Sequence, residues 1–188
     1  MKQNKTNKKF VYLISPNKIT NDDFYTDLAL VLRTGNVSYF QLRLKKETDK
    51  NKLIIGKKIK KICNKFKIKF IVNDDPLLAK KLNADGCHLG QKDMSVDKAR
   101  KILKDKIIGV TCHNSVALAK IAIESGADYL AFGAFYPSKT KIAKYKASLI
   151  ILKTVKEITS LPIVAIGGIK LNNYKKLLLN KANFLAIS

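Results

Sequence analysis

Short apolar runs, rich in β-branched residues, alternate with longer amphipathic stretches along the whole chain, and this alternation constrains the fold more than any other feature. The runs that we expect to form strands are Phe10–Ile14, Val37–Arg43, Phe70–Asn73, Gly86–Gly90, Ile107–His113, Tyr129–Gly133, Pro162–Gly168 and Phe184–Ser188. Helical patterns lie between them at about residues 22–34, 48–66, 76–83, 95–104, 115–125, 148–159 and 171–180. Strand–helix alternation of this kind predicts a parallel sheet. The strands are nearly continuous apolar segments, as expected when both faces of a sheet are covered.

Eight strands and seven helices favour an α/β fold of the (β/α)₈ TIM-barrel type over a doubly wound sheet, and no GxGxxG motif follows the first strand. The 188 residues fit one domain spanning residues 1–188. They are few for such a barrel, which typically has about 250. Because Ser188 closes the eighth strand, we expect the barrel to lack its final helix, through truncation at the C-terminal end or a differently covered flank.

The net charge of +23 raises the question of a nucleic-acid or membrane partner. Only three of the 37 basic residues are arginine, which supplies the planar fork used for base edges and phosphate clamps. The lysines are spread along the chain at helical spacing between apolar residues. We therefore interpret the charge as a solvated surface that attracts small anions, and expect neither nucleic acid nor a membrane as partner.

Three cysteines, with no CxxC pair, argue against a disulfide framework. No apolar run approaches the ~20 residues of a membrane span, and residues 1–10 precede no signal-peptide core. The chain is therefore expected to be cytoplasmic. The dipeptides Cys87-His88 and Cys112-His113 do not favour zinc, because adjacent strand residues face opposite ways. We expect Cys87 and Cys112 to be packing residues.

Functional residues of a (β/α)₈ barrel come from the carboxyl ends of its strands. The second strand ends in Gln41, Arg43 and Lys45, and alternate residues point to one side of a strand. Two cations there would form a phosphate clamp. Polar strand ends that pair with local carboxylates are the alternative, which we favour less because a buried Gln or Arg needs partners.

Carboxylates follow the third and fourth strands. Asp74 comes directly after Asn73, and Asp93 follows the next strand. Two carboxylates in neighbouring loops suit Mg²⁺, which takes one or two carboxylates together with substrate phosphate oxygens. Asp75 precedes Pro76, so we expect it to be only a helix N-cap.

Two later loops have features of a phosphate site. Residues 136–141 form a loop rich in hydroxyls and lysines, which fits either a phosphate-gripping lid or an ordinary solvated loop. Gly167 and Gly168 follow the seventh strand, where bare backbone amides can approach a phosphate. The alternative is a tight turn that needs glycine for a positive φ.

Taken together, these motifs resemble the thiamine-phosphate synthase family. The resemblance covers nearly the whole chain and rests on FQLRLK (40–45), IVNDDPLLAKKLNADGCHLGQKD (71–93), IGVTCH (108–113), GADYLAFGAFYPSKTK (126–141) and LPIVAIGGI (161–169). It implies a (β/α)₈ barrel and a transferase of thiamine biosynthesis. Such an enzyme joins a pyrimidine methyl diphosphate to a thiazole ethyl phosphate and releases diphosphate.

The resemblance also implies roles for individual residues. The residues that would bind the pyrimidine diphosphate are Gln41, Arg43, Lys45 and Asn73, with Thr111 beside the diphosphate or pyrimidine and Lys141 on the diphosphate. Asp74 and Asp93 would ligate Mg²⁺. Ser138 and Thr140 would bind the thiazole phosphate together with Gly168. By the same resemblance, the catalytic residues would be Arg43, Lys45, Thr111 and Lys141.

The resemblance implies a dissociative reaction, in which diphosphate leaves first and an electron-rich pyrimidine stabilises the cation. The thiazole nitrogen then attacks without losing a proton, so no general base is needed. Two rival functions are a thiazole tautomerase-like isomerase on the same barrel and a non-catalytic anion-binding protein. The resemblance is also compatible with a homo-oligomer, because a flank of the barrel left uncovered would encourage self-association.

Overall fold

The computed structural model describes residues 9–138 and 144–188. The strands are β1 (Val11–Ile14), β2 (Val37–Leu42), β3 (Lys69–Asn73), β4 (Gly86–Leu89), β5 (Ile107–His113), β6 (Tyr129–Gly133), β7 (Ile163–Ile166) and β8 (Phe184–Ile187). The helices are α1 (Asp23–Arg33), α2 (Asp49–Lys65), α3 (Pro76–Lys81), α4 (Val96–Leu103), α5 (Val116–Glu124), α6 (Leu149–Ile158) and α7 (Tyr174–Leu179). The predicted order of strands and helices is confirmed throughout the described residues.

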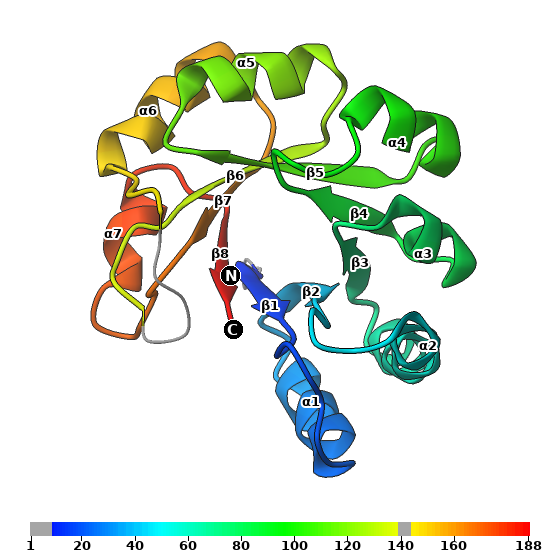
Figure 1. The fold of residues 1–188 in the computed structure, drawn as a ribbon. Helices are drawn as coiled ribbons and strands as arrows, with labels where there is room; N and C mark the ends of the chain where they lie inside the picture. Colours follow the sequence, from blue (N-terminus) through cyan, green and yellow to red (C-terminus); the bar gives the residue numbers. More distant parts are fainter. Residues whose placement is uncertain (1–8, 139–143) are drawn as a thin grey trace, which may run out of the picture.

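All strands pair in parallel with their sequence neighbours, and β8 pairs with β1, so the sheet closes into a barrel (Figure 1). The predicted TIM barrel is therefore confirmed. Helices surround it except outside β8 and β1, between α7 and α1, and no described residue forms a helix after β8. None of the helices in the described part of the chain has the length and apolar character that a membrane span needs.

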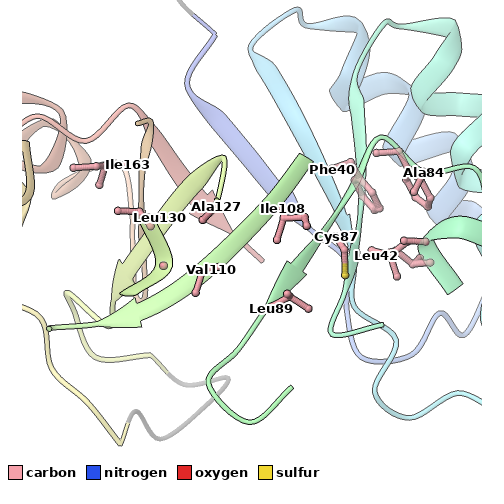
Figure 2. Packing of buried hydrophobic residues seen from close by; sticks show 14 of the residues in the cluster. Phe40, Leu42, Ala84, Cys87, Leu89, Ile108, Val110, Ala127, Leu130 and Ile163 are labelled. Atoms are coloured by element: carbon pink, nitrogen blue, oxygen red, sulfur yellow. The ribbon is translucent and has the colours of Figure 1, made fainter. Parts of the chain in front are cut away.

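Successive strand residues separate into two layers, as the pleat of a strand requires. One set points outward and packs under the helices; it includes Phe40, Leu42, Cys87, Leu89 and Ile108 (Figure 2). Cys87 and Cys112 are fully buried in this outer core, which confirms their predicted role in packing. The set that points inward fills the barrel and is unusually aromatic and polar.

The same arrangement occurs twice and fixes the amino ends of β3 and β5. Asp85, just before β4, accepts a hydrogen bond from the Phe70 amide of β3 at 2.9 Å. Asp128, just before β6, accepts one from the Ile108 amide of β5 at 2.7 Å. Both aspartates thus pin the start of the preceding strand, at the end of the barrel opposite the predicted functional loops.

The N-cap prediction for Asp75 is also confirmed. Its carboxylate accepts a hydrogen bond from the Leu78 amide at 2.9 Å, and Pro76 occupies the first position of α3. A capping carboxylate and an N-terminal proline both stabilise a helix start. Because Asp75 is used in this way, only Asp74 of the adjacent pair is available to the barrel mouth.

Candidate active site

A lysine and two aspartates meet at the carboxyl ends of β2, β3 and β4. Lys45 Nζ lies 3.0 Å from Asp74 Oδ2, and both side chains remain partly exposed to solvent. Asp93 Oδ2 accepts a hydrogen bond from the Gly90 amide at 2.6 Å, so the loop after β4 holds this carboxylate in place. The arrangement brings together two carboxylates and one cation that the sequence had separated by up to about fifty residues.

The two carboxylates are close enough to influence each other. Burial raises the pKa of Asp93; the Gly90 amide opposes this rise, and the neighbouring Asp74 carboxylate raises the pKa further. Lys45 partly offsets the repulsion. Two acidic groups drawn together in this way bind protons more readily, because either a proton or a cation relieves their repulsion.

Local backbone geometry brings Asp74 to this position. Its φ of 65° lies in the left-handed region, which aspartate adopts more readily than most residues. Its amide donates to the His88 carbonyl at 2.8 Å, which ties the end of β3 to β4. A small cavity of about 100 Å³ opens beside Lys45 and Asp74, with Asn73 in its lining.

The other residues predicted at the end of β2 have different surroundings. Gln41 is buried inside the barrel, and its Nε2 donates to the Tyr12 hydroxyl at 3.0 Å. Arg43 lies past the last residue of β2, and its Nη1 donates to Asn17 Oδ1 at 2.6 Å. Gln41, Arg43 and Lys45 therefore contact separate partners, and their joint role in binding diphosphate stays a prediction.

Inside the barrel, Thr111 is connected to a buried histidine, His88, for which the sequence favoured neither a zinc-binding nor a nucleophilic role. Thr111 Oγ1 lies 2.8 Å from His88 Nε2, and His88 Nδ1 lies 2.9 Å from the Tyr129 hydroxyl. The Tyr129 hydroxyl is in turn 2.7 Å from that of Tyr12. Burial lowers the pKa of His88 to about 4, although Asp74 opposes this shift, so its imidazole is neutral at neutral pH.

Sequence reasoning did not include Tyr12, His88 and Tyr129 among the candidate residues, although hydrogen bonds connect them to Thr111. One signal could have found them: each occupies a position of its strand that alternation directs into the barrel, beside the predicted Gln41 and Thr111. Polar groups in such an interior require one another as partners.

The loops after β6 and β7 pack against each other at the same end of the barrel. The Tyr136 amide donates to the Gly167 carbonyl at 3.0 Å. A Cβ atom on Gly168, whose φ is 61°, would lie 2.3 Å from the Pro137 carbonyl oxygen, so only glycine fits this turn. This places Gly168 beside the segment that leads to Ser138. Thr140 and Lys141, the other predicted residues of this loop, lie outside the described residues.

The closed parallel barrel, with charged residues gathered at the carboxyl ends of adjacent strands, belongs to the (β/α)₈-barrel class, whose enzymes have their active sites in the βα loops. Comparison with known proteins narrows this class. The model of the thiamine monophosphate synthase family matches residues 11–188. The chain belongs to this family, and it is therefore a transferase of thiamine biosynthesis.

Individual relatives agree with this assignment. The chain is 80% identical to the thiamine-phosphate synthase of Pelagibacter ubique (strain HTCC1062), over 100% of this chain and 91% of that protein. It is 40% identical to the thiamine-phosphate synthase of Nitrosomonas eutropha, over 95% of this chain and 84% of that protein. The solved structure of thiamine phosphate pyrophosphorylase from Pyrococcus furiosus superposes with a TM-score of 0.82 at 28% identity, covering 96% of this chain and 86% of that one.

Proposed function

We propose that the chain joins a pyrimidine methyl diphosphate to a thiazole ethyl phosphate at the carboxyl ends of its strands, in a substitution assisted by Mg²⁺. Membership of the thiamine monophosphate synthase family supports the overall reaction. The observation that carries the proposal for the site is the meeting of the Asp74 and Asp93 carboxylates beside Lys45.

The donor set fits a magnesium ion. Asp74 and Asp93 offer oxygen ligands from adjacent loops, and their mutual repulsion favours a cation between them. Within residues 9–138 and 144–188, no group of three or more His, Cys, Asp or Glu side chains is arranged to hold a metal. A site with two carboxylates is typical of Mg²⁺ that completes its shell with water and substrate phosphate oxygens. A magnesium ion bound there would neutralise charge on the leaving diphosphate.

The protein residues have separate tasks in this reaction. Lys45 and Arg43, with Lys141, would bind the diphosphate and stabilise the negative charge that grows as the carbon–oxygen bond breaks. The electron pair of that bond leaves with the diphosphate. Gln41, Asn73 and Thr111 would orient the pyrimidine diphosphate. The thiazole nitrogen then forms the new carbon–nitrogen bond with its lone pair, so the protein need not accept a proton.

The second substrate would bind at the other side of the barrel mouth. Gly168 and Ser138 belong to loops that pack against each other, and Thr140 follows Ser138 two positions later in the sequence. We propose that these three residues bind the thiazole phosphate. Its nitrogen would thereby face the carbon atom from which diphosphate departs.

The direct test is formation of thiamine phosphate from the two phosphorylated substrates, with Mg²⁺ and with a chelator. The variants are Asp74→Ala and, as a matched control, Asp105→Ala, which removes an exposed carboxylate from the turn before β5. We expect product that requires both Mg²⁺ and Asp74, and no loss for the control. Product that forms equally well in chelator, or in the Asp74→Ala variant, would remove the metal site from the proposal.

The same assay separates the rivals. Conversion of a thiazole phosphate without Mg²⁺ and without coupling would support the tautomerase-like isomerase. An anion-binding protein would bind either substrate and release no product. Two further expectations belong to the proposal: that the barrel acts as a single domain, and that it works in the cytoplasm, which its three free, buried cysteines support.

A further inference from the structure

A continuous chain of hydrogen bonds crosses the interior of the barrel from β2 to β5. Gln41 Nε2 lies 3.0 Å from the Tyr12 hydroxyl, which lies 2.7 Å from the Tyr129 hydroxyl. Tyr129 is 2.9 Å from His88 Nδ1, and His88 Nε2 is 2.8 Å from Thr111 Oγ1. Five side chains from five different strands thus form one series, which we call the interior relay.

Counting protons gives the interior relay a direction. The Gln41 Nε2 group can only donate, so the Tyr12 oxygen accepts from it. Either hydroxyl could donate between Tyr12 and Tyr129, but if Tyr129 donated, the buried Tyr12 proton would have no partner among the described residues, so we take Tyr12 as the donor. Tyr129 then has its own proton left for His88 Nδ1. A neutral imidazole that accepts at Nδ1 carries its proton on Nε2, and that proton is donated to Thr111.

Burial distinguishes the two ends of this series. Gln41, Tyr12 and Tyr129 are at most 4% exposed and His88 is 9% exposed, whereas Thr111 is only half-buried. Thr111 is therefore the more exposed end of the interior relay. Since its oxygen accepts from His88, its hydroxyl proton is free to point outward.

Packing holds the central pair in this arrangement. The rings of His88 and Tyr129 stack with centroids 5.6 Å apart and planes 15° from parallel. Gly109 on β5 leaves room for the Tyr129 ring, because a Cβ atom there would lie 1.9 Å from Tyr129 Cζ. The hydroxyl of Tyr129 is thus aimed at His88 by its surroundings on both sides.

We propose that Tyr129 is a positioning residue that fixes the His88 imidazole in its Nε2–H tautomer. The Thr111 oxygen then accepts a hydrogen bond from His88, and the Thr111 hydroxyl donates a hydrogen bond to an anionic oxygen of the substrate at the barrel mouth. Tyr129 itself does not touch the substrate. It acts through the hydrogen bonds from Tyr129 to His88 and from His88 to Thr111, and Thr111 is the residue that contacts the substrate. This inference rests on the proposed function for its catalytic consequence, but its tautomer is a property of the protein without substrates.

The tautomer is measured first, by nitrogen NMR on histidine-labelled protein without ligands. The chain has only two histidines, so a His88→Gln variant assigns the signals. We expect His88 protonated at Nε2 in the unaltered protein. In Tyr129→Phe, which keeps the ring and removes the donor to Nδ1, we expect a mixture of tautomers or the Nδ1–H form.

The kinetic readout uses the same variants. Tyr129→Phe should lower kcat by about tenfold, the value of one well-placed hydrogen bond, with little change in KM for the thiazole phosphate. Tyr12→Phe, one link further away, should shift the tautomer in the same direction and by less. The matched control is Tyr39→Phe, since Tyr39 stacks on Tyr12 at 5.3 Å and its hydroxyl makes no hydrogen bond within the described residues.

The outcomes separate this inference from the proposed function. His88 protonated at Nδ1 in the unaltered protein would overturn the direction of the interior relay. An unchanged tautomer and unchanged kcat in Tyr129→Phe would overturn the role of Tyr129, and so would an equal loss in the Tyr39→Phe control. Absence of synthase activity in the unaltered protein would instead contradict the proposed function, while the NMR result would still decide the tautomer.

Discussion

Replacing Gly109 with alanine should displace the Tyr129 ring and destabilise the barrel. The added Cβ would lie 1.9 Å from Tyr129 Cζ and 2.3 Å from each Cε atom. Non-bonded carbon atoms normally remain about 3.5–4.0 Å apart, so the ring would have to move by roughly 1.5–2 Å. Tyr129 is 3% exposed, and a close-packed interior offers no space for such a movement.

The expected cost combines three effects. Overpacking of a buried site costs about 1–3 kcal/mol. The displaced Tyr129 hydroxyl would lose its hydrogen bonds to Tyr12 and His88, each worth about 1 kcal/mol. Alanine also restricts the unfolded chain, which offsets about 0.4–1 kcal/mol. The free energy of unfolding should therefore fall by about 2–4 kcal/mol, and Tm by about 4–16 °C for a domain of this size.

A double-mutant cycle with Tyr129→Ala tests the cause. That variant alone should cost about 3–5 kcal/mol, the usual loss for a large buried ring. In the double variant the methyl group meets no ring, so Gly109→Ala should add no further cost. The coupling free energy should then be about 2–4 kcal/mol, measured by urea unfolding followed by circular dichroism.

A glycine with no ring beside it serves as the control for this double-mutant cycle. Gly35 has a φ of 78° and open space around it, so Gly35→Ala should cost about 1–2 kcal/mol through backbone strain alone. It should show no coupling to Tyr129→Ala. If the Gly109 and Tyr129 substitutions were additive within about 0.5 kcal/mol, the claim that Gly109 makes room for this ring would be refuted.

Three further predictions concern charged groups. The Arg100 guanidinium donates to three main-chain carbonyls and to Asp128, all at 2.6–2.7 Å, so Arg100→Ala should lower the unfolding free energy by about 2–3 kcal/mol in urea titrations without changing KM. Burial and the nearby Asp74 carboxylate raise the pKa of Asp93, so the Asp93 carboxyl group binds a proton more tightly in the folded state than in the unfolded state. The stability that this proton provides is fully present below the ordinary aspartate pKa of about 3.9. It is lost as the pH rises through the raised pKa of the folded state. Asp74→Asn should reduce that pH-dependent loss, measured by urea unfolding at a series of pH values without Mg²⁺, and an unchanged pH dependence would contradict the contact. Lys45→Met should lower kcat/KM for the diphosphate substrate by about tenfold or more, yet change stability by less than about 1 kcal/mol because its ion pair is exposed.

The sequence determined the order and type of the elements because hydrophobic periodicity is a local signal. The expected strands at Ile107–His113 and Tyr129–Gly133 have the observed limits, since each is a largely apolar run bounded by polar residues or glycine. The N-cap at Asp75 followed from its neighbour Pro76 alone. Even the approach of Asp74 and Asp93 could be expected, because carboxyl ends of neighbouring parallel strands share one edge.

The tertiary structure decided where the alternating direction of strand side chains stops and which buried polar side chains form hydrogen bonds. Strand β2 ends at Leu42, so the rule that alternate residues share a side no longer governs Arg43, which turns to Asn17. The partners Tyr12 and Tyr129 are 117 residues apart, and no local pattern can indicate a hydrogen bond over that distance. Closure of the barrel brings these strands around one interior, where polar side chains can find partners only in one another.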